Sequence, residues 1–168
     1  EKLGLLSEQQ DDDDLYESLT LCMAQLEIDM TIFFRLLSDV TDLTSNEEAL
    51  ALLADSFYHP LSNDEQDVLT QWLGRYLDRL AQDKVLLGTT DAKRKSTMNT
   101  VNPKYVLRNY LAQNAIERAE QNDYSEIARL SAVLMRPYDE QPEAQHYFSK
   151  RPEWAKNKAG CSMLSCSS

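Results

Sequence analysis

The chain has 168 residues, with 17 basic and 28 acidic side chains and a formal net charge of −11 at pH 7. Nucleic acids and anionic membranes select basic surfaces, so this balance disfavours both as partners. Four glycines and five prolines are too few for the many turns of a β-sandwich or barrel, and no apolar run reaches membrane-spanning length. Three unevenly spaced cysteines do not resemble a secreted disulfide framework, so we expect a reducing, cytoplasmic location.

The first predicted helix follows a run of aspartates at positions 11–14. Apolar residues then recur at steps of three and four up to Leu26, which predicts one buried stripe. The aspartates stand where the positive end of the helix macrodipole favours anions. A metal site is the alternative, which consecutive carboxylates serve poorly because they point in different directions around a helix. We interpret Cys22, on the apolar stripe, as a small core residue, with redox function as the alternative.

Capping residues predict the next helix starts. Asp29 precedes a short apolar helix, and two S-x-x-E capping boxes stand at 45–48 and 62–65. In such a box the serine and the glutamate each satisfy a backbone N–H of the first turn. The second box opens the longest predicted helix, which Gly88 ends.

The only dense basic cluster of the chain stands at positions 93–95. We interpret it as the solvated face of a helix. A phosphate contact is the alternative, but three charges in an acidic chain are weak support for it.

Asn102 and Pro103 have the pattern of a helix start. Asparagine is a good N-cap, and proline suits the first helical position because its missing N–H has no partner there. We expect Tyr105 and Ile116 on the buried face of this helix, and Asp123 as the cap of one more helix. The fold class is therefore all-α: an irregular bundle of about six to seven helices over residues 1–148, with a flexible tail at 149–168.

A search for catalytic patterns gives no site within this chain. There is no glycine-rich phosphate loop, no G-x-S-x-G turn and no pair of C-x-x-C motifs. His59 and His146 stand outside any ligand spacing, so we expect structural or surface roles for both, in preference to metal binding or acid–base chemistry. We assign no catalytic, cofactor-binding or metal-binding residue here.

Cys161 and Cys166 are the candidate redox residues. Chain ends are usually mobile and exposed, so we do not expect these thiols to be packing groups. They can pair with each other if the four residues between them turn, or the tail can carry either one to a thiol elsewhere. Two free exposed thiols are the remaining alternative.

Several stretches resemble one known family. These are "VNPKYVLRNYLAQNAIERAEQNDYSEIARLSAVLMRPYDE", "RPEW", and a final cysteine followed by two serines, with "KLGL" and "FFRLLSDV" as further similar segments. Together they resemble the C-terminal region of the selenoprotein O family, in a bacterial form that contains cysteine. The likeness covers nearly the whole chain, and the chain begins within a helical turn, so we expect the C-terminal piece of a longer protein.

The resemblance implies a protein-kinase-like fold with a pseudokinase core. It implies transfer of AMP from ATP to Ser, Thr or Tyr hydroxyls of protein substrates, with Mg²⁺ or Mn²⁺ as the cofactor. The residues that hold ATP and metal would lie upstream, so none is carried over to this sequence. The implied partners are the N-terminal catalytic lobe of the same protein and the protein substrates.

One functional position of the family does match this chain. Cys166 stands third from the end, where animal members have selenocysteine and bacterial members commonly have cysteine. Cys161 departs from the animal pattern, because it stands five residues before that position instead of three. A disulfide from Cys166 to an upstream cysteine is therefore at least as well supported as a pair within the tail.

Two other functions fit the residues. The first is a freestanding helical module that binds a partner through its apolar stripes. The second is a thiol oxidoreductase that works through Cys166 alone, which would need a depressed thiol pKa from the few nearby lysines.

Overall fold

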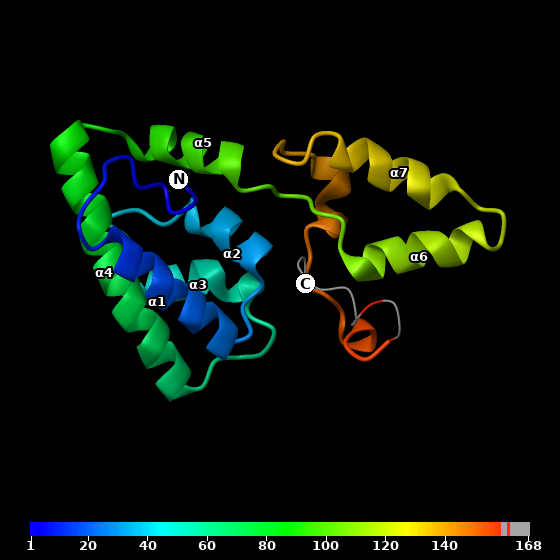
Figure 1. Ribbon diagram of the computed structural model, residues 1–168, viewed down its shortest axis with the longest axis horizontal. Helices are drawn as coiled ribbons and strands as arrows, with labels where there is room; N and C mark the ends of the chain where they lie inside the picture. Colours follow the sequence, from blue (N-terminus) through cyan, green and yellow to red (C-terminus); the bar gives the residue numbers. More distant parts are fainter. Residues whose placement is uncertain (159–160, 162–168) are drawn as a thin grey trace. The chain divides into compact units, whose positions relative to one another are not determined.

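The computed structural model describes residues 1–158 and residue 161 (Figure 1). The described residues form seven α-helices and three short 3-10 helices, and among them the only β-type pairing is a single antiparallel bridge between Ile28 and Phe57. This confirms the all-α prediction and the number of helices. The chain divides into two compact units, unit 1 (residues 1–102) and unit 2 (residues 103–168). The expected boundary at residue 148 separates a helical region from a tail, and it stays a prediction.

Unit 1 is built around one long helix, α4, on which α1 and α3 pack (Figure 1). Its helices are α1 (Asp12–Gln25), α2 (Met30–Leu37), α3 (Asn46–Leu53), the short 3-10 helix η1 (Ala54–Ser56), α4 (Asn63–Leu87) and α5 (Asp91–Val101). Leu69, Leu73, Tyr76 and Leu80 follow each other at helical spacing along α4 and are buried. This stripe gives unit 1 a continuous core.

The predicted helix starts of unit 1 are confirmed. The Asp29 carboxylate accepts the Ile32 N–H at 3.0 Å at the start of α2. Both capping boxes form, at 45–48 before α3 and at 62–65 before α4. Gly88 ends α4 with a positive φ of 62°, a conformation that glycine adopts without steric cost.

The predicted helix start at Asn102 and Pro103 is wrong. Asn102 is the C-cap of α5, and the next helix begins only at Asn109. The Asn102 side-chain amide is turned away to donate to the Lys2 carbonyl oxygen at 2.9 Å. Because the backbone N–H groups of Lys104 and Tyr105 both donate to the Pro137 carbonyl, the segment is held in a non-helical form by contacts that local sequence does not reveal.

The basic cluster at 93–95 is not a uniformly solvated face. Arg94 is only 4% exposed, and its guanidinium donates to the Tyr76 hydroxyl and to the carbonyl oxygens of Ser38 and Val40. A buried cation is tolerated where such acceptors surround it. Arg94 therefore joins α5 to α4 and to the end of α2.

Unit 2 contains a helical hairpin and two short 3-10 helices. Its elements are α6 (Asn109–Ala119), α7 (Ser125–Leu134), η2 (Pro142–Tyr147) and η3 (Glu153–Ala155). Tyr105 is buried as predicted, but Ile116 is half exposed, because the buried face of α6 consists of Tyr110, Leu111 and Ala115 and Ile116 lies one residue past it. The Asp123 carboxylate accepts the Ser125 N–H at 3.0 Å, so it supports the start of α7 although Tyr124 is the N-cap residue.

Candidate functional site

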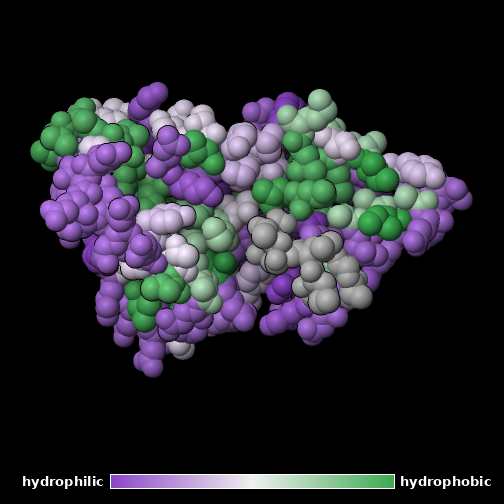
Figure 2. Space-filling model, viewed as in Figure 1, coloured by the Kyte–Doolittle hydropathy of each residue, from purple (hydrophilic) through white to green (hydrophobic). Residues whose placement is uncertain are grey.

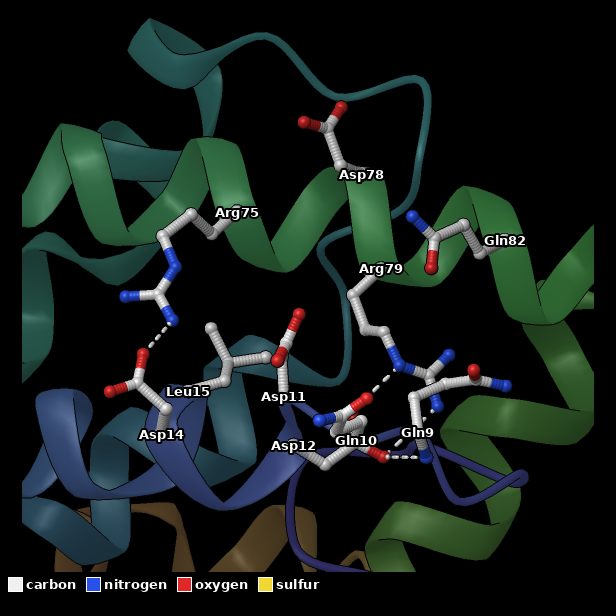
Figure 3. A pocket seen from close by; sticks show the side chains of 10 residues that line it. All are labelled: Gln9, Gln10, Asp11, Asp12, Asp14, Leu15, Arg75, Asp78, Arg79 and Gln82. Atoms are coloured by element: carbon white, nitrogen blue, oxygen red, sulfur yellow. Dashed lines mark hydrogen bonds and ion pairs between the residues drawn. The ribbon is translucent and has the colours of Figure 1, made fainter.

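A polar groove of about 440 Å³ lies between the start of α1 and the middle of α4 (Figure 3). Its charged lining consists of Asp11, Asp12, Asp14, Asp78, Arg75 and Arg79. Arg75 donates to the Asp14 carboxylate at 2.5 Å, and both side chains are exposed. Asp12 and Asp14 of the first turn of α1 thus pair with arginines of α4. This favours the interpretation that they serve the helix terminus and ion pairs, over a metal site.

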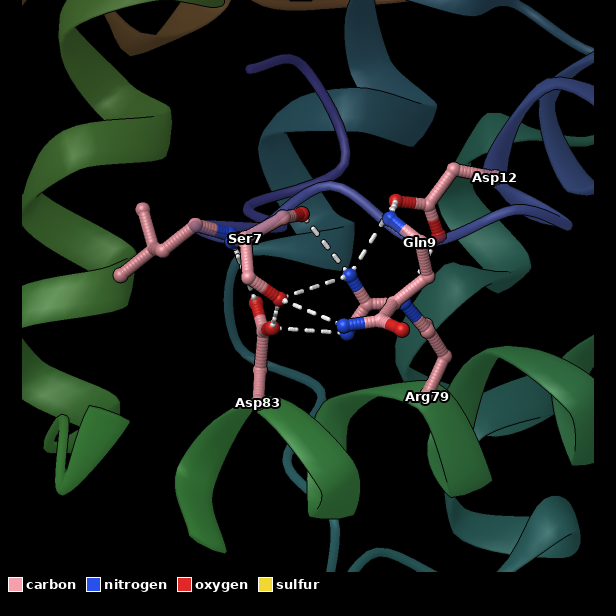
Figure 4. A network of polar contacts seen from close by, with 6 residues as sticks. Ser7, Gln9, Asp12, Arg79 and Asp83 are labelled. Atoms are coloured by element: carbon pink, nitrogen blue, oxygen red, sulfur yellow. Dashed lines mark hydrogen bonds and ion pairs between the residues drawn. The ribbon is translucent and has the colours of Figure 1, made fainter. Parts of the chain in front are cut away.

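Arg79 lies at the centre of a network at one end of this groove (Figure 4). Its Nε donates to Asp12 Oδ1 at 2.7 Å, its Nη1 to Asp83 Oδ1 at 2.7 Å and its Nη2 to the Ser7 carbonyl at 2.8 Å. Asp83 also accepts the Leu6 N–H at 2.6 Å and the Ser7 hydroxyl. The network fastens the N-terminal segment to both α1 and α4.

The network keeps its carboxylates ionised. The hydrogen bond from Arg79 lowers the pKa of Asp12. Burial alone would raise the pKa of Asp83, but hydrogen bonds from Arg79, Ser7 and the Leu6 N–H outweigh burial and lower it. A general base or acid works best with a pKa near the working pH. The pKa values of Asp12 and Asp83 are lowered, away from neutral pH, and both carboxylates are already paired with Arg79. They are therefore suited to a structural role and not to proton transfer.

The three cysteines differ in their surroundings. Cys22 is buried on α1, and burial raises the pKa of its thiol to about 11, which fits the predicted core role. Cys161 is 2% exposed and belongs to the core of unit 2. The expectation that both thiols near the C terminus are not packing groups is therefore wrong for Cys161, while its redox role stays a prediction. Cys166 lies outside the described residues.

The segment that leads to Cys161 is docked on α6. The Trp154 ring meets the Tyr110 ring edge to face, with centroids 6.3 Å apart. Lys158 forms an ion pair with Glu117 of α6 and lies 5.1 Å above the Trp154 ring. The Cys161 N–H donates to the Lys158 carbonyl at 3.0 Å. These contacts hold the polypeptide against α6 as far as Lys158.

The histidines are accounted for by local contacts. His59 Nδ1 lies 3.2 Å from the Pro60 carbonyl oxygen, and the exposed His146 ring lies 4.0 Å from the Tyr147 ring. In the described part of the chain, no group of three or more His, Cys, Asp or Glu side chains is placed to hold a metal ion. Nor does any described helix combine the length and the apolar character needed to cross a bilayer.

Sequence reasoning missed the Arg79 network. The pair Arg79 and Asp83 has the spacing of an ion pair on one helix, and this signal could have been found. Ser7 and Asp12 carry no such signal, because they reach Arg79 from about 70 residues away through the fold.

Comparisons with known proteins agree across the chain. A family model described as protein adenylyltransferase SelO matches residues 1–135. The protein nucleotidyltransferase YdiU of Flavobacterium johnsoniae is 47% identical over 169 residues, which cover 99% of this chain and 32% of that protein. The protein of the same name from Xanthomonas campestris pv. campestris is 46% identical over 168 residues, with 99% of this chain and 31% of that protein covered. The chain thus spans about a third of the length of these relatives.

Proposed function

The chain belongs to the protein adenylyltransferase SelO family, and from this premise we propose that it is the C-terminal helical region of an enzyme that transfers AMP from ATP to proteins. The observation that carries the proposal is the identity of 46–47% over nearly all of this chain with two proteins named as protein nucleotidyltransferases. The chain covers only 31–32% of them, so most of the parent enzyme lies outside it.

In the proposed reaction, a Ser, Thr or Tyr hydroxyl of a protein substrate attacks the α-phosphorus of ATP. The new O–P bond forms as the bond to the β-phosphate oxygen breaks, pyrophosphate leaves, and the hydroxyl proton passes to a base. Mg²⁺ or Mn²⁺ would neutralise phosphate charge in such a reaction. Among the described residues no group of three or more His, Cys, Asp or Glu side chains is placed to hold the metal ion. We assign no residue of this chain to the binding of ATP or metal.

We propose that this region braces the catalytic lobe. The proposal is supported by the way its internal charges are paired. Arg79 is held by two carboxylates, and Arg94 by a hydroxyl and backbone carbonyls. Networks of this kind fix the positions of the helices that they join.

We further propose that Cys166 makes the enzyme sensitive to redox state. Two thiols would lose two electrons and two protons to a cellular oxidant and form a disulfide, which a reductant would reverse. Cys161 is packed in the core of unit 2, which favours a cysteine elsewhere in the parent protein as the partner. We propose that the protein works in the cytoplasm, where such a disulfide is transient.

The experiment uses the parent protein with ATP labelled at either the α- or the γ-phosphate. We expect the α-label to enter protein acceptors and the γ-label to be released in pyrophosphate. Incorporation of the γ-label would identify a phosphate-transferring kinase and overturn the proposal. Incorporation of neither label into any protein of a cell extract would also overturn it, and would leave the helical interaction module as the better account.

A further inference from the structure

The C-terminal end of α4 is apolar on nearly all sides. Val85, Leu86 and Leu87 are consecutive and are 88%, 62% and 47% exposed. Figure 2 shows hydrophobic side chains gathered over this end of unit 1, where α4 leads toward α5. Single exposed aliphatic residues are ordinary on protein surfaces, but a contiguous group of them marks a contact surface.

No rotation of α4 could bury these side chains within unit 1. Successive residues of an α-helix point about 100° apart, so three in a row cover most of its circumference. A helix that is apolar all round is usually surrounded by protein. The described residues of unit 1 therefore leave this end of α4 uncovered.

The apolar end is held in a fixed position. Immediately before it, Lys84 Nζ forms ion pairs with Asp42 at 2.7 Å and with Asp91 at 3.2 Å. Asp83, on the next residue back, is held by Arg79 and by the backbone N–H of Leu6. Because the surface is ordered before binding, a partner would lose little conformational entropy in ordering it.

Leu6 is another exposed apolar residue, and its backbone is anchored near this end of α4. Its backbone is bonded to Asp83, and Leu87 follows Asp83 by one helical turn on the same side of α4. The Leu6 side chain is itself exposed. The four side chains Leu6, Val85, Leu86 and Leu87, here called the α4-end patch, thus belong to one end of unit 1.

We propose that the α4-end patch packs against the rest of the parent polypeptide, through an apolar surface on that part. This inference rests on the proposed function, in which the chain is one region of a longer enzyme. Four side chains offer far less than the roughly 1,200 Å² of total burial that a stable complex of separate proteins needs. A partner in the same polypeptide acts at an effective concentration on the order of millimolar. A small patch is therefore sufficient to keep the two parts in contact.

The test measures thiol reactivity in the parent protein carrying Val85→Cys, with Gln71→Cys as the matched control on an exposed position of the same helix. Each protein is treated with a maleimide in its native state and in urea, and the modified peptides are identified by mass spectrometry. We expect the thiol introduced at position 85 to react at least about tenfold more slowly in the native state, because a packed contact must open before reaction. The thiol introduced at position 71 should react at similar rates in both states.

Reaction at position 85 that is as fast in the native state as in urea would overturn the inference. Protection at position 85 that disappears on dilution would also overturn it, since a second copy of the protein would then be the partner. The measurement needs no ATP, so it is independent of AMP transfer. Protection without AMP transfer would refute the proposed function alone, and AMP transfer without protection would refute this inference alone.

Discussion

The two units of the chain build their cores from different kinds of segment. In unit 1, fully buried residues such as Leu19, Phe33 and Leu73 come from helices that pack around α4. In unit 2, half of the ten buried core residues lie outside α6 and α7: Tyr105, Ala144, Tyr147, Ala155 and Cys161. Unit 2 is also the smaller of the two. Unit 2 therefore depends on its irregular segments. Substitutions near the C terminus should lower the stability of unit 2 and leave the stability of unit 1 unchanged.

The sequence provides a separate probe for each unit. Of its two tryptophans, Trp72 is buried in unit 1 and Trp154 lies in unit 2. The variants Trp154→Phe and Trp72→Phe each leave one tryptophan, so the unfolding of each unit can be followed separately by tryptophan fluorescence.

The largest effect is expected from Phe33→Ala. The Phe33 ring is fully buried, with its centroid 5.9 Å from that of Phe34 and 6.1 Å from that of Trp72. Loss of such a ring leaves a cavity and costs about 3–5 kcal/mol of unfolding free energy. Urea unfolding followed by Trp72 fluorescence measures the loss, with the exposed Leu43→Ala as the control. An equal shift in the urea midpoint followed by Trp154 would mean that the two units unfold together. That result would contradict the separate stabilities expected for them.

The next effect is expected from Cys161→Asp, which is directed at unit 2. A carboxyl group at this buried position lacks the water that would solvate it, which costs about 1–3 kcal/mol. The Trp154 transition should move to lower urea while the Trp72 transition stays in place. Cys161→Ala removes the thiol without adding a polar group, so it should cost less. An unchanged Trp154 transition in Cys161→Asp would show that unit 2 does not rely on this segment.

Acid should weaken unit 1 through the Arg79 network. The pKa of both Asp12 and Asp83 is lowered from the ordinary value of 3.8 in the folded chain. Their contribution to stability is complete above that ordinary value and is lost as the pH falls through the lower, folded values, that is, below about pH 4. Asp12→Asn should reduce the pH dependence of the Trp72 transition. Asp13→Asn, at an exposed neighbouring position, serves as the control, and an equal effect of both would contradict the network's role.

The smallest effect is expected from the capping serines. Ser45→Ala and Ser62→Ala each remove the acceptor for a first-turn N–H, and each should cost about 1 kcal/mol in unit 1. Both losses of unfolding free energy should appear in the transition followed by Trp72 fluorescence and not in the one followed by Trp154 fluorescence. A loss below the error of the urea measurement would mean that water replaces the serine hydroxyl without cost.

Sequence was most informative where the determinants are local. The roles of Asp29, Ser45, Ser62 and Gly88 depend on residues within one helical turn, and all were predicted. The same local rule failed at Asn102, because its side chain bonds to Lys2, 100 residues away. The burial of other residues was missed for a related reason.

Arg94 and Cys161 are polar or terminal by sequence, yet both are buried. Arg94 donates to acceptors from α4 and from the chain directly after α2, and Cys161 lies in the core of unit 2. Neither set of neighbours is adjacent in sequence. Periodicity therefore predicts helices and their caps, while the partners of a buried polar side chain require the fold.

We have proposed that this region belongs to an AMP-transferring enzyme and that its last cysteine makes the enzyme redox-sensitive. The direct measurement is incorporation of AMP from α-labelled ATP by the parent protein, with and without reductant, for the wild type, Cys161→Ala and Cys166→Ala. We predict that reductant changes the rate in the wild type and in Cys161→Ala but not in Cys166→Ala. An unchanged response in Cys166→Ala, or a rate indifferent to reductant in all three proteins, would contradict the claim.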